Sequence, residues 1–189
     1  MNLKNNFNNF KNFLKEDTWQ SWVVSIILAF VLIKLIFFPT LSLLTGTSLP
    51  LVVVESCSMH HSISFDAWWE GNKLWYMKRD ISKRMFETFP NKNGLNKGDV
   101  ILLVKKENYN LGDIIVFDSK YKYPLIHRVI EENPYGTKGD HNFGQLDSEK
   151  GIDENIIYGK TFLRVPYIGW VKLIFFEFSK PPEQRGFCK

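Results

Sequence analysis

Residues 49–59 read L-P-L-V-V-V-E-S-C-S-M, a run of β-branched residues that ends in two serines with one residue between them. Because β-branched residues are enriched in strands, we expect residues 49–54 to form the first strand of a domain. Side chains two positions apart on a strand share a face, which would place Ser56 and Ser58 side by side. The sequence before this stretch looks like a membrane anchor. The sequence after it has the mixed polar pattern of a water-soluble, strand-rich domain.

Length and composition limit the organisation of the chain. Its 189 residues, 44% of them hydrophobic, suffice for one domain with a core and one additional element. The 24 basic residues outnumber the 20 acidic ones only slightly, and the lysines are spread along the chain instead of forming a basic arm. We therefore expect no nucleic-acid partner.

An apolar segment precedes the domain. Residues 19–38 read W-Q-S-W-V-V-S-I-I-L-A-F-V-L-I-K-L-I-F-F, long enough as a helix to cross the hydrocarbon of a bilayer. We predict that they form a transmembrane helix. Lys34 favours an end near residue 38, since a lysine close to a helix end can reach the headgroups at little cost. Residues 39–48 then form a membrane-proximal linker.

The fate and orientation of this segment follow from its flanks. A cleaved secretory signal is the alternative to an anchor, but the apolar core is too long and the best small-residue site, at 45–47, is poor. Lysines in residues 1–18 predict a cytoplasmic amino terminus, a single pass through the cytoplasmic membrane and an outside domain. The phenylalanines in residues 1–18 fit either a short helix on the membrane surface or a solvated tail.

Residues 49–165 have the pattern of a mainly β, antiparallel all-β domain. Short apolar runs at 100–104, 114–117, 125–131 and 156–165 lie between turn residues, and Gly-Asp pairs enter the first two. Strands at this spacing without intervening helical patterns predict antiparallel pairing.

Two further segments flank or interrupt this strand pattern. Residues 62–97 form an insertion whose aromatic residues, mixed with charges, predict one or two short amphipathic helices. This insertion packs on the domain or serves as a flap toward membrane or substrate. The apolar residues 166–189 are predicted to be an interfacial segment, with a core element and a second span as weaker alternatives.

Four polar residues are candidates for chemistry: Ser58, His127, Asp140 and Asp147. A serine nucleophile needs a base to remove its proton. Histidine suits that role near neutral pH, and a carboxylate can fix its tautomer. Taken alone, however, a histidine on a strand is more often structural, and residues 139–142 are more often an ordinary turn.

The cysteines and the remaining histidines carry weaker signals. Cys57 and Cys188 show no metal-site or redox-motif spacing, and Cys57 is expected to pack as a small apolar side chain. His60 and His61 are adjacent and therefore point apart. We expect neither a metal nor a cofactor.

The conjunction of these features resembles a known family. After the anchor come S-C-S-M at 56–59, G-D-I-I-V-F at 112–117, I-H-R-V-I at 126–130 and K-G-D-H-N at 138–142, then Asp147. In this order they look like the boxes of type I signal peptidases, over nearly the whole chain except the insertion. Bacterial members use a serine and a lysine. His127 in the lysine's place resembles the archaeal and endoplasmic-reticulum branch.

The resemblance implies a role for each candidate. Ser58 is the nucleophile and His127 the base. Asp147 is ranked above Asp140 as the residue that orients His127, with Asp140 supporting the turn. Ser56 is the expected oxyanion donor, beside the backbone N–H of Ser58.

The implied function is that of a membrane-anchored serine endopeptidase that cleaves signal peptides from exported preproteins after small residues. Its partners are then preprotein signal peptides, the lipid bilayer and the protein-export channel. The alternative is a non-enzymatic, membrane-tethered β module that binds extended peptides or a secretion-machinery partner. The separation between Ser58 and His127 in the folded chain discriminates between the two.

Overall fold

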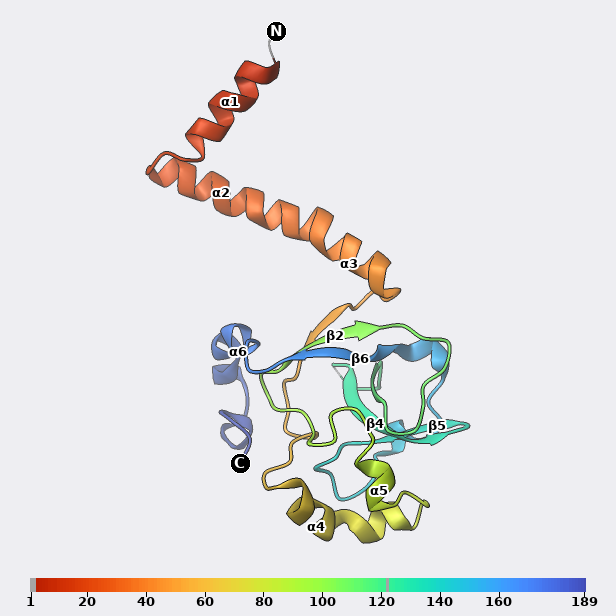
Figure 1. The fold of residues 1–189 in the computed structure, drawn as a ribbon. Coiled ribbons are helices and arrows are strands. Elements are labelled where there is room, and N and C mark those ends of the chain that lie inside the picture. Colours follow the sequence, from red (N-terminus) through yellow and green to blue (C-terminus); the bar gives the residue numbers. More distant parts are fainter. Residues whose placement is uncertain (1–2, 122) are drawn as a thin grey trace. The chain divides into compact units, whose positions relative to one another are not determined.

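The computed structural model describes residues 3–121 and 123–189. The chain divides into two units, the first ending at Leu44 and the second comprising Thr45–Lys189. Figure 1 shows the elements of both units, which are described separately below.

The first unit is helical. Its elements are α1 (Leu3–Phe13), α2 (Trp19–Leu32), the π-helical turn η1 (Ile33–Phe37) and α3 (Phe38–Thr45). The last three form one helix of 27 residues, Trp19–Thr45, which by length and composition can cross a membrane. The hydroxyl of Thr18 accepts a hydrogen bond from the Ser21 N–H and so caps this helix. An N-terminal helix able to span a membrane is thus confirmed; its orientation stays a prediction.

The spanning helix is longer than predicted. Its 27 residues measure about 40 Å, compared with about 30 Å of hydrocarbon. The linker expected over residues 39–48 is therefore helical as far as Thr45, and Lys34 lies well inside the helix instead of near its end. The widened turn η1 ends two residues before Pro39, which lacks an N–H and crowds the carbonyl four residues back.

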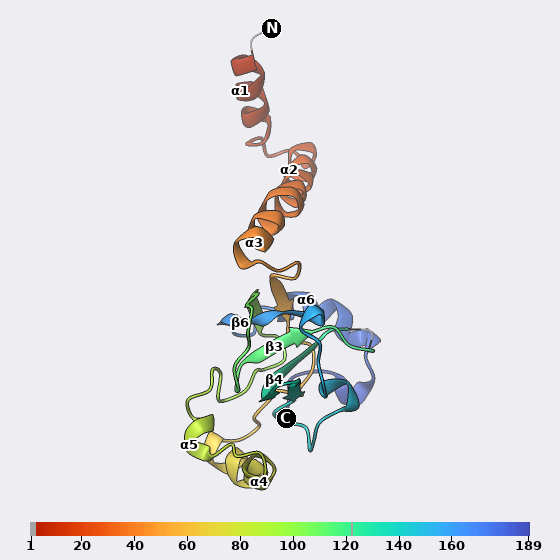
Figure 2. The same cartoon turned by 90° about the vertical axis from the view of Figure 1, so that its right-hand side faces the viewer.

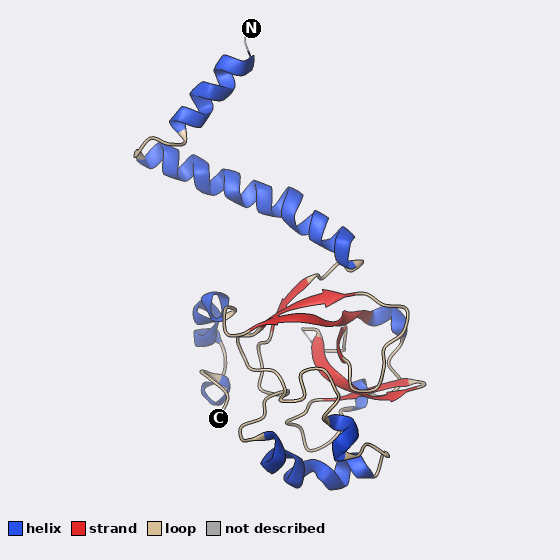
Figure 3. Ribbon diagram, in the orientation of Figure 1, coloured by secondary structure: helices blue, strands red, loops and turns tan. Residues whose placement is uncertain are grey.

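The second unit is built on a curved, six-stranded antiparallel sheet, a half-barrel (Figures 1 and 3). The strands are β1 (Leu51–Val53), β2 (Val100–Val104), β3 (Ile114–Phe117), β4 (Leu125–Glu132), β5 (Tyr135–Lys138) and β6 (Ile157–Val165). Their order is β1-β2-β6-β3-β4-β5, and all five neighbouring pairs are antiparallel. The predicted antiparallel sheet is confirmed. Because 39% of the chain is helical and 20% is strand, the chain as a whole is mixed instead of mainly β.

The central strands follow the expected residue patterns. β2 and β3 have the predicted bounds, and both Gly-Asp pairs form turns, with positive φ at Gly98 and Gly112. β5 was not predicted, since its sequence, Y-G-T-K, has little apolar character. It pairs with β4 through a register shift between Val129 and Glu131.

β3 lies in the middle of the core and is buried on both faces. Ile114 and Val116 pack into one apolar cluster with Val54 and Met59, whereas Ile115 and Phe117 face a second cluster. This arrangement explains why the residues of β3 form a continuous apolar run instead of an alternating one.

The insertion forms two helices, α4 (Phe65–Met77) and α5 (Lys83–Phe86), as predicted. In both Figures 1 and 2 these helices lie together at one end of the domain, away from α6. Trp68, Trp69, Tyr76 and Phe86 form a third apolar cluster that also includes Ile130 of β4. Of the two predicted roles, packing against the domain is therefore observed.

Short helical segments lie before and after β6. These are η2 (Asp147–Glu149), η3 (Glu154–Ile156), α6 (Trp170–Phe176), η4 (Glu177–Ser179) and η5 (Pro182–Gln184). α6 has seven residues and is too short for a second membrane crossing. Its Leu173 is buried, whereas Val171 and Phe175 are exposed. An interfacial location of this segment stays a prediction.

Candidate active site

Ser58 lies in a turn that follows β1. The His60 N–H donates to the Cys57 carbonyl at 3.0 Å and closes this turn. Ser56 and Ser58 therefore lie beyond the end of β1, whereas the sequence predicted that they would share a face of the strand. The Ser58 carbonyl accepts from the His141 N–H at 2.8 Å. Next to it, the Met59 side chain is fully buried in the core. These contacts fix the backbone on both sides of the Ser58 hydroxyl.

His127 faces this hydroxyl from β4. Its Nε2 lies 2.9 Å from Ser58 Oγ, and its side chain is 2% exposed. The Ser56 hydroxyl lies 3.2 Å from Ser58 Oγ. The structure therefore brings together three of the predicted residues, Ser56, Ser58 and His127, although His127 is 69 positions from Ser58 in the sequence.

A glutamate, and not an aspartate, contacts the other nitrogen of the His127 ring. The carboxylate of Glu149 meets His127 Nδ1, and both side chains are buried. The second carboxylate oxygen of Glu149 accepts from the Leu146 N–H at 2.6 Å. A carboxylate at Nδ1 keeps the proton on that nitrogen, which leaves Nε2 free to accept from the Ser58 O–H. The geometry of a nucleophile, a base and an orienting carboxylate is complete with Glu149.

The structure corrects the prediction that Asp147 orients His127. Asp147 is exposed and pairs with Lys150 at 2.9 Å, and the hydrogen bond and charge of Lys150 lower the pKa of this carboxyl group. Asp147 and Glu149 are the first and last residues of the single turn η2. With three residues per turn, side chains two positions apart point in different directions. One of them therefore reaches His127 while the other reaches solvent. The sequence D-S-E at 147–149 has a second carboxylate two positions after Asp147, and this was the sequence signal that could have identified Glu149.

Asp140, the other predicted aspartate, is fully buried but serves a different partner. Its carboxylate accepts from Arg128 Nε at 2.9 Å and Nη2 at 2.7 Å. It also lies 3.1 Å from His61 Nε2, whose ring stacks on Trp68 with 3.8 Å between centroids. Burial opposes ionisation of Asp140, but the Arg128 guanidinium and His61 hold its pKa well below the usual range. Asp140 thus stabilises the scaffold of the site.

Arg128 is at the centre of this scaffold, although no sequence pattern singles it out. Its side chain is fully buried, and besides Asp140 its guanidinium donates to the carbonyls of Pro90, Asn91 and Gly112, each at 2.9 Å. The planar, forked guanidinium has enough donors to satisfy all four acceptors. Because Arg128 follows His127 on β4, these bonds fix the strand that carries His127.

The segment that ends β5 approaches the site closely. A Cβ atom at Gly139 would lie 2.8 Å from the Ser58 carbonyl oxygen and 2.9 Å from His127 Nε2, so only glycine fits at this position. The preceding Lys138 is buried, and its ammonium donates to the Gly139 carbonyl at 3.0 Å. Burial lowers the pKa of Lys138 to about 8.

Cys57 is not packed as a free apolar side chain, contrary to expectation. It forms a disulfide with Cys188, across a sequence separation of 131 residues. The C-terminal segment folds back to the turn between Ser56 and Ser58, a proximity that spacing along the chain cannot indicate. The turn that carries Ser58 is thus covalently tied to the end of the domain.

His60 and His61 take separate partners: His60 Nδ1 lies 2.8 Å from Asn96 Oδ1, whereas His61 faces Asp140. Within residues 3–121 and 123–189, no group of three or more His, Cys, Asp or Glu side chains is arranged to hold a metal ion. Comparison with known proteins yields no matching family model and no matching curated protein. The chemical capability of the site therefore rests on its own geometry, which suits nucleophilic attack by a serine on an acyl group.

Proposed function

We propose that this chain is a membrane-anchored serine endopeptidase that removes signal peptides from exported preproteins after small residues. The observation that carries the proposal is the 2.9 Å contact between Ser58 Oγ and His127 Nε2, with the Glu149 carboxylate on His127 Nδ1. Ser58 is half-buried and its neighbour Ser56 is exposed, so the serine side of the site borders solvent.

The first half of the reaction forms an acyl-enzyme. His127 Nε2 takes the hydroxyl proton as Ser58 Oγ bonds to the carbonyl carbon of the scissile peptide. Buried Glu149 stabilises the resulting imidazolium. The imidazolium then gives its proton to the nitrogen of the leaving peptide, and the carbon–nitrogen bond breaks. The mature protein leaves with a free amino terminus.

The second half restores the enzyme. Water gives a proton to His127, attacks the ester carbonyl and releases the signal peptide as a carboxylic acid, while Ser58 regains its proton. In each half, the Ser56 hydroxyl turns from Ser58 Oγ, 3.2 Å away, toward the oxyanion. A positioned donor of this kind contributes about 2.7–4 kcal/mol to transition-state stabilisation.

Two observations support a location at a membrane with the domain outside. The helix Trp19–Thr45 is long and apolar enough to be the anchor, and a signal peptide inserts in the same bilayer. Anchoring enzyme and substrate in one membrane raises their effective concentration. The Cys57–Cys188 disulfide suits an oxidising environment, as found outside the cytoplasm. The chain resembles the archaeal and endoplasmic-reticulum signal peptidases in the order of its boxes, which supports the substrate class.

The competing proposal is a tethered β module that binds peptides without cleaving them. It requires no particular arrangement of Ser58 and His127. Hydrogen-bond contact between these two side chains, with a buried carboxylate behind the histidine, is what favours the peptidase.

Cleavage by the full chain in detergent micelles tests the proposal. The substrate is a model preprotein with small residues before the cleavage site, and the product is identified by mass spectrometry. Ser58→Ala and His127→Ala are each expected to lower kcat by about 10⁴-fold or more, since the members of such a unit act together. Ser62→Ala, which removes an exposed serine nearby, should cleave at the wild-type rate. Normal cleavage by Ser58→Ala would sink the proposal.

A further inference from the structure

The C-terminal segment, residues 170–189, contacts two of the three residues that lead up to Ser58, namely Glu55 and Cys57. Lys172 Nζ lies 2.9 Å from the Glu55 carboxylate, and Lys180 Nζ donates to the Glu55 carbonyl at 3.1 Å. Cys188 is bonded to Cys57. These contacts hold the backbone of residues 55–57 immediately before Ser58.

The same segment is anchored to the domain independently of the disulfide. Lys97, 1% exposed, donates to Glu177 and to the Gln184 carbonyl, both at 2.7 Å. Glu177 also accepts from the Gly186 N–H at 2.7 Å. Although desolvation opposes its ionisation, the bonds from Lys97, Gly186 and Lys180 lower the pKa of Glu177 to about 2.

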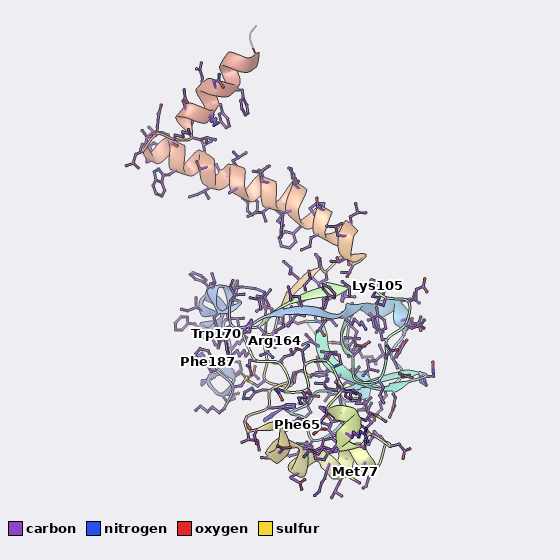
Figure 4. The ribbon with its side chains drawn as sticks, viewed as in Figure 1. Phe65, Met77, Lys105, Arg164, Trp170 and Phe187 are labelled. Carbon is purple, nitrogen blue, oxygen red and sulfur yellow. A yellow bond between two sulfur atoms is a disulfide. The ribbon has the colours of Figure 1, made fainter. Side chains whose placement is uncertain are left out.

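Aromatic packing adds to this anchorage. Phe187, next to the disulfide, lies 4.5 Å from Trp170 between ring centroids, and Figure 4 shows the two side chains close together. The Trp170 indole N–H donates to the Lys97 carbonyl at 3.1 Å. The segment is therefore a folded element whose position is set by the domain, and the disulfide transmits that position to the turn at Ser58.

Because Cys57 is next to Ser58 in the chain, the Cys57–Cys188 disulfide can affect the position of the Ser58 hydroxyl. Cys57 separates Ser56 from Ser58. Their hydroxyls lie 3.2 Å apart, and that of Ser58 lies 2.9 Å from His127 Nε2. A displacement of about 1 Å at a reacting group can cost about 10²-fold in rate. Both cysteines are half-buried, so a small dithiol can reach the bond.

We propose that the C-terminal segment is a positioning element for Ser58, and that the Cys57–Cys188 disulfide makes this positioning sensitive to reduction. The inference rests on the proposed peptidase function. A thiolate of a dithiol attacks one sulfur of the bond and forms a mixed disulfide. The second thiol of the reagent then displaces the protein sulfur, which leaves two protein thiols and an oxidised, cyclic reagent. Two electrons pass from the dithiol to the protein.

The central experiment compares the oxidised full chain in detergent micelles with the same preparation after dithiothreitol and after reoxidation. Reduction should lower kcat about 10- to 100-fold with little change in KM, and reoxidation should restore it. Cys188→Ser should have the kcat of the reduced wild type and should not respond to dithiothreitol. Equal kcat values for oxidised wild type, reduced wild type and Cys188→Ser would overturn the proposal.

Hydrogen–deuterium exchange separates a positioning role from a loss of folding and needs no activity. Reduction should speed exchange in residues 55–60 and at the His141 N–H, which donates to the Ser58 carbonyl. Exchange in β3 should not change. Faster exchange throughout the domain, or no change at residues 55–60, contradicts positioning. If the oxidised wild type cleaves nothing, the proposed function fails, while the exchange result still decides whether the segment positions the turn.

Removing one non-covalent contact provides a second variant that leaves the disulfide intact. Lys180→Met deletes the bond to the Glu55 carbonyl and is expected to lower kcat several-fold, with a further loss on reduction. Lys83→Met removes an exposed ion pair with Asp66 in the insertion and should keep the wild-type kcat. Equal kcat values for the two variants would show that the segment does not act through Glu55.

Discussion

His127 and Arg128 are neighbours on β4, and each is paired with a buried carboxylate, yet the two pairs have different surroundings. His127 lies between Glu149 and the hydroxyl of Ser58. Arg128 lies between Asp140 and three backbone carbonyls. Successive residues of a strand point to opposite faces. One strand thus carries the proposed catalytic pair, His127 and Glu149, on one side and the structural pair, Arg128 and Asp140, on the other.

Arg128 and His127 differ in how many of their nitrogen atoms have hydrogen-bond acceptors within the protein. The Arg128 guanidinium donates to the Asp140 carboxylate and to three backbone carbonyls, so the protein provides acceptors on every side. The His127 ring has one nitrogen held by Glu149 and the other facing a hydroxyl that can give up its proton. Burial of a carboxylate therefore does not by itself mark a catalytic group. What the carboxylate contacts decides its role.

The largest effect is expected from breaking the proposed catalytic pair, His127 and Glu149. Glu149→Gln replaces the carboxylate by an amide, which can support the wrong tautomer of His127, and kcat should fall by about 10⁴-fold. Asp147→Asn, the matched change at the exposed position of the same turn, should leave kcat unchanged. Steady-state cleavage of the model preprotein by both variants measures the difference. The reverse result, with Asp147→Asn inactive and Glu149→Gln active, would restore the original aspartate prediction.

A smaller effect, on stability instead of rate, is expected from breaking the structural pair. Asp140→Asn leaves the buried Arg128 guanidinium without its counter-charge, which should lower the free energy of unfolding by about 3–5 kcal/mol. Urea unfolding of the full chain, followed by tryptophan fluorescence, measures this loss. Asp66→Asn, at an exposed ion pair, is the control and should not shift the midpoint.

The pH dependence of this loss follows from the lowered pKa of Asp140. An ionised carboxylate with a depressed folded-state pKa stabilises the protein fully above its unfolded-state value, 3.8. That contribution is lost as the pH falls toward the folded-state pKa. Wild type and Asp140→Asn should therefore differ most above pH 3.8 and converge below it. A constant difference would mean that the variant acts through packing alone.

Local patterns were sufficient to predict most of the sheet and the core of the site. β2 and β3 are short apolar runs bounded by turn residues, and this pattern is typical of buried strands. Ser58 and His127 were singled out because their flanking boxes resemble, in order, those of a known family. β5 was missed because a strand of Y-G-T-K gains its stability from pairing with β4, a long-range contact.

The partners of the site residues could not be predicted, because they depend on how the chain folds back. The choice between Asp147 and Glu149 depends on the phase of one 3₁₀ turn, which no periodicity in the sequence reports. The bond between Cys57 and Cys188 depends on the path of the C-terminal segment over the domain. Arg128 shows no special pattern until its four acceptors, from distant segments, are in place.

The smallest expected effect concerns Lys138, which tests how well the buried surroundings of Arg128 and Asp140 exclude water. It is buried next to Asp140, over the rings of Trp75 and Tyr76, and burial lowers its pKa from 10.5 to about 8. Between these values the unfolded chain binds the proton more strongly, so stability should rise with pH in this window. The difference between wild type and Lys138→Met should change by on the order of 3 kcal/mol in favour of wild type.

Urea unfolding at several values between pH 7 and 10.5 measures this change, and Lys83→Met controls for the loss of an exposed lysine. Because the shift arises from desolvation of the ammonium group, it requires that the cluster of α4 stays packed over Lys138. A flat difference across the window would mean that Lys138 is hydrated in solution, and that the insertion does not seal the structural side of β4. Arg128 and its four acceptors would then be the only support for a water-excluding structural face of β4, opposite the face that carries His127.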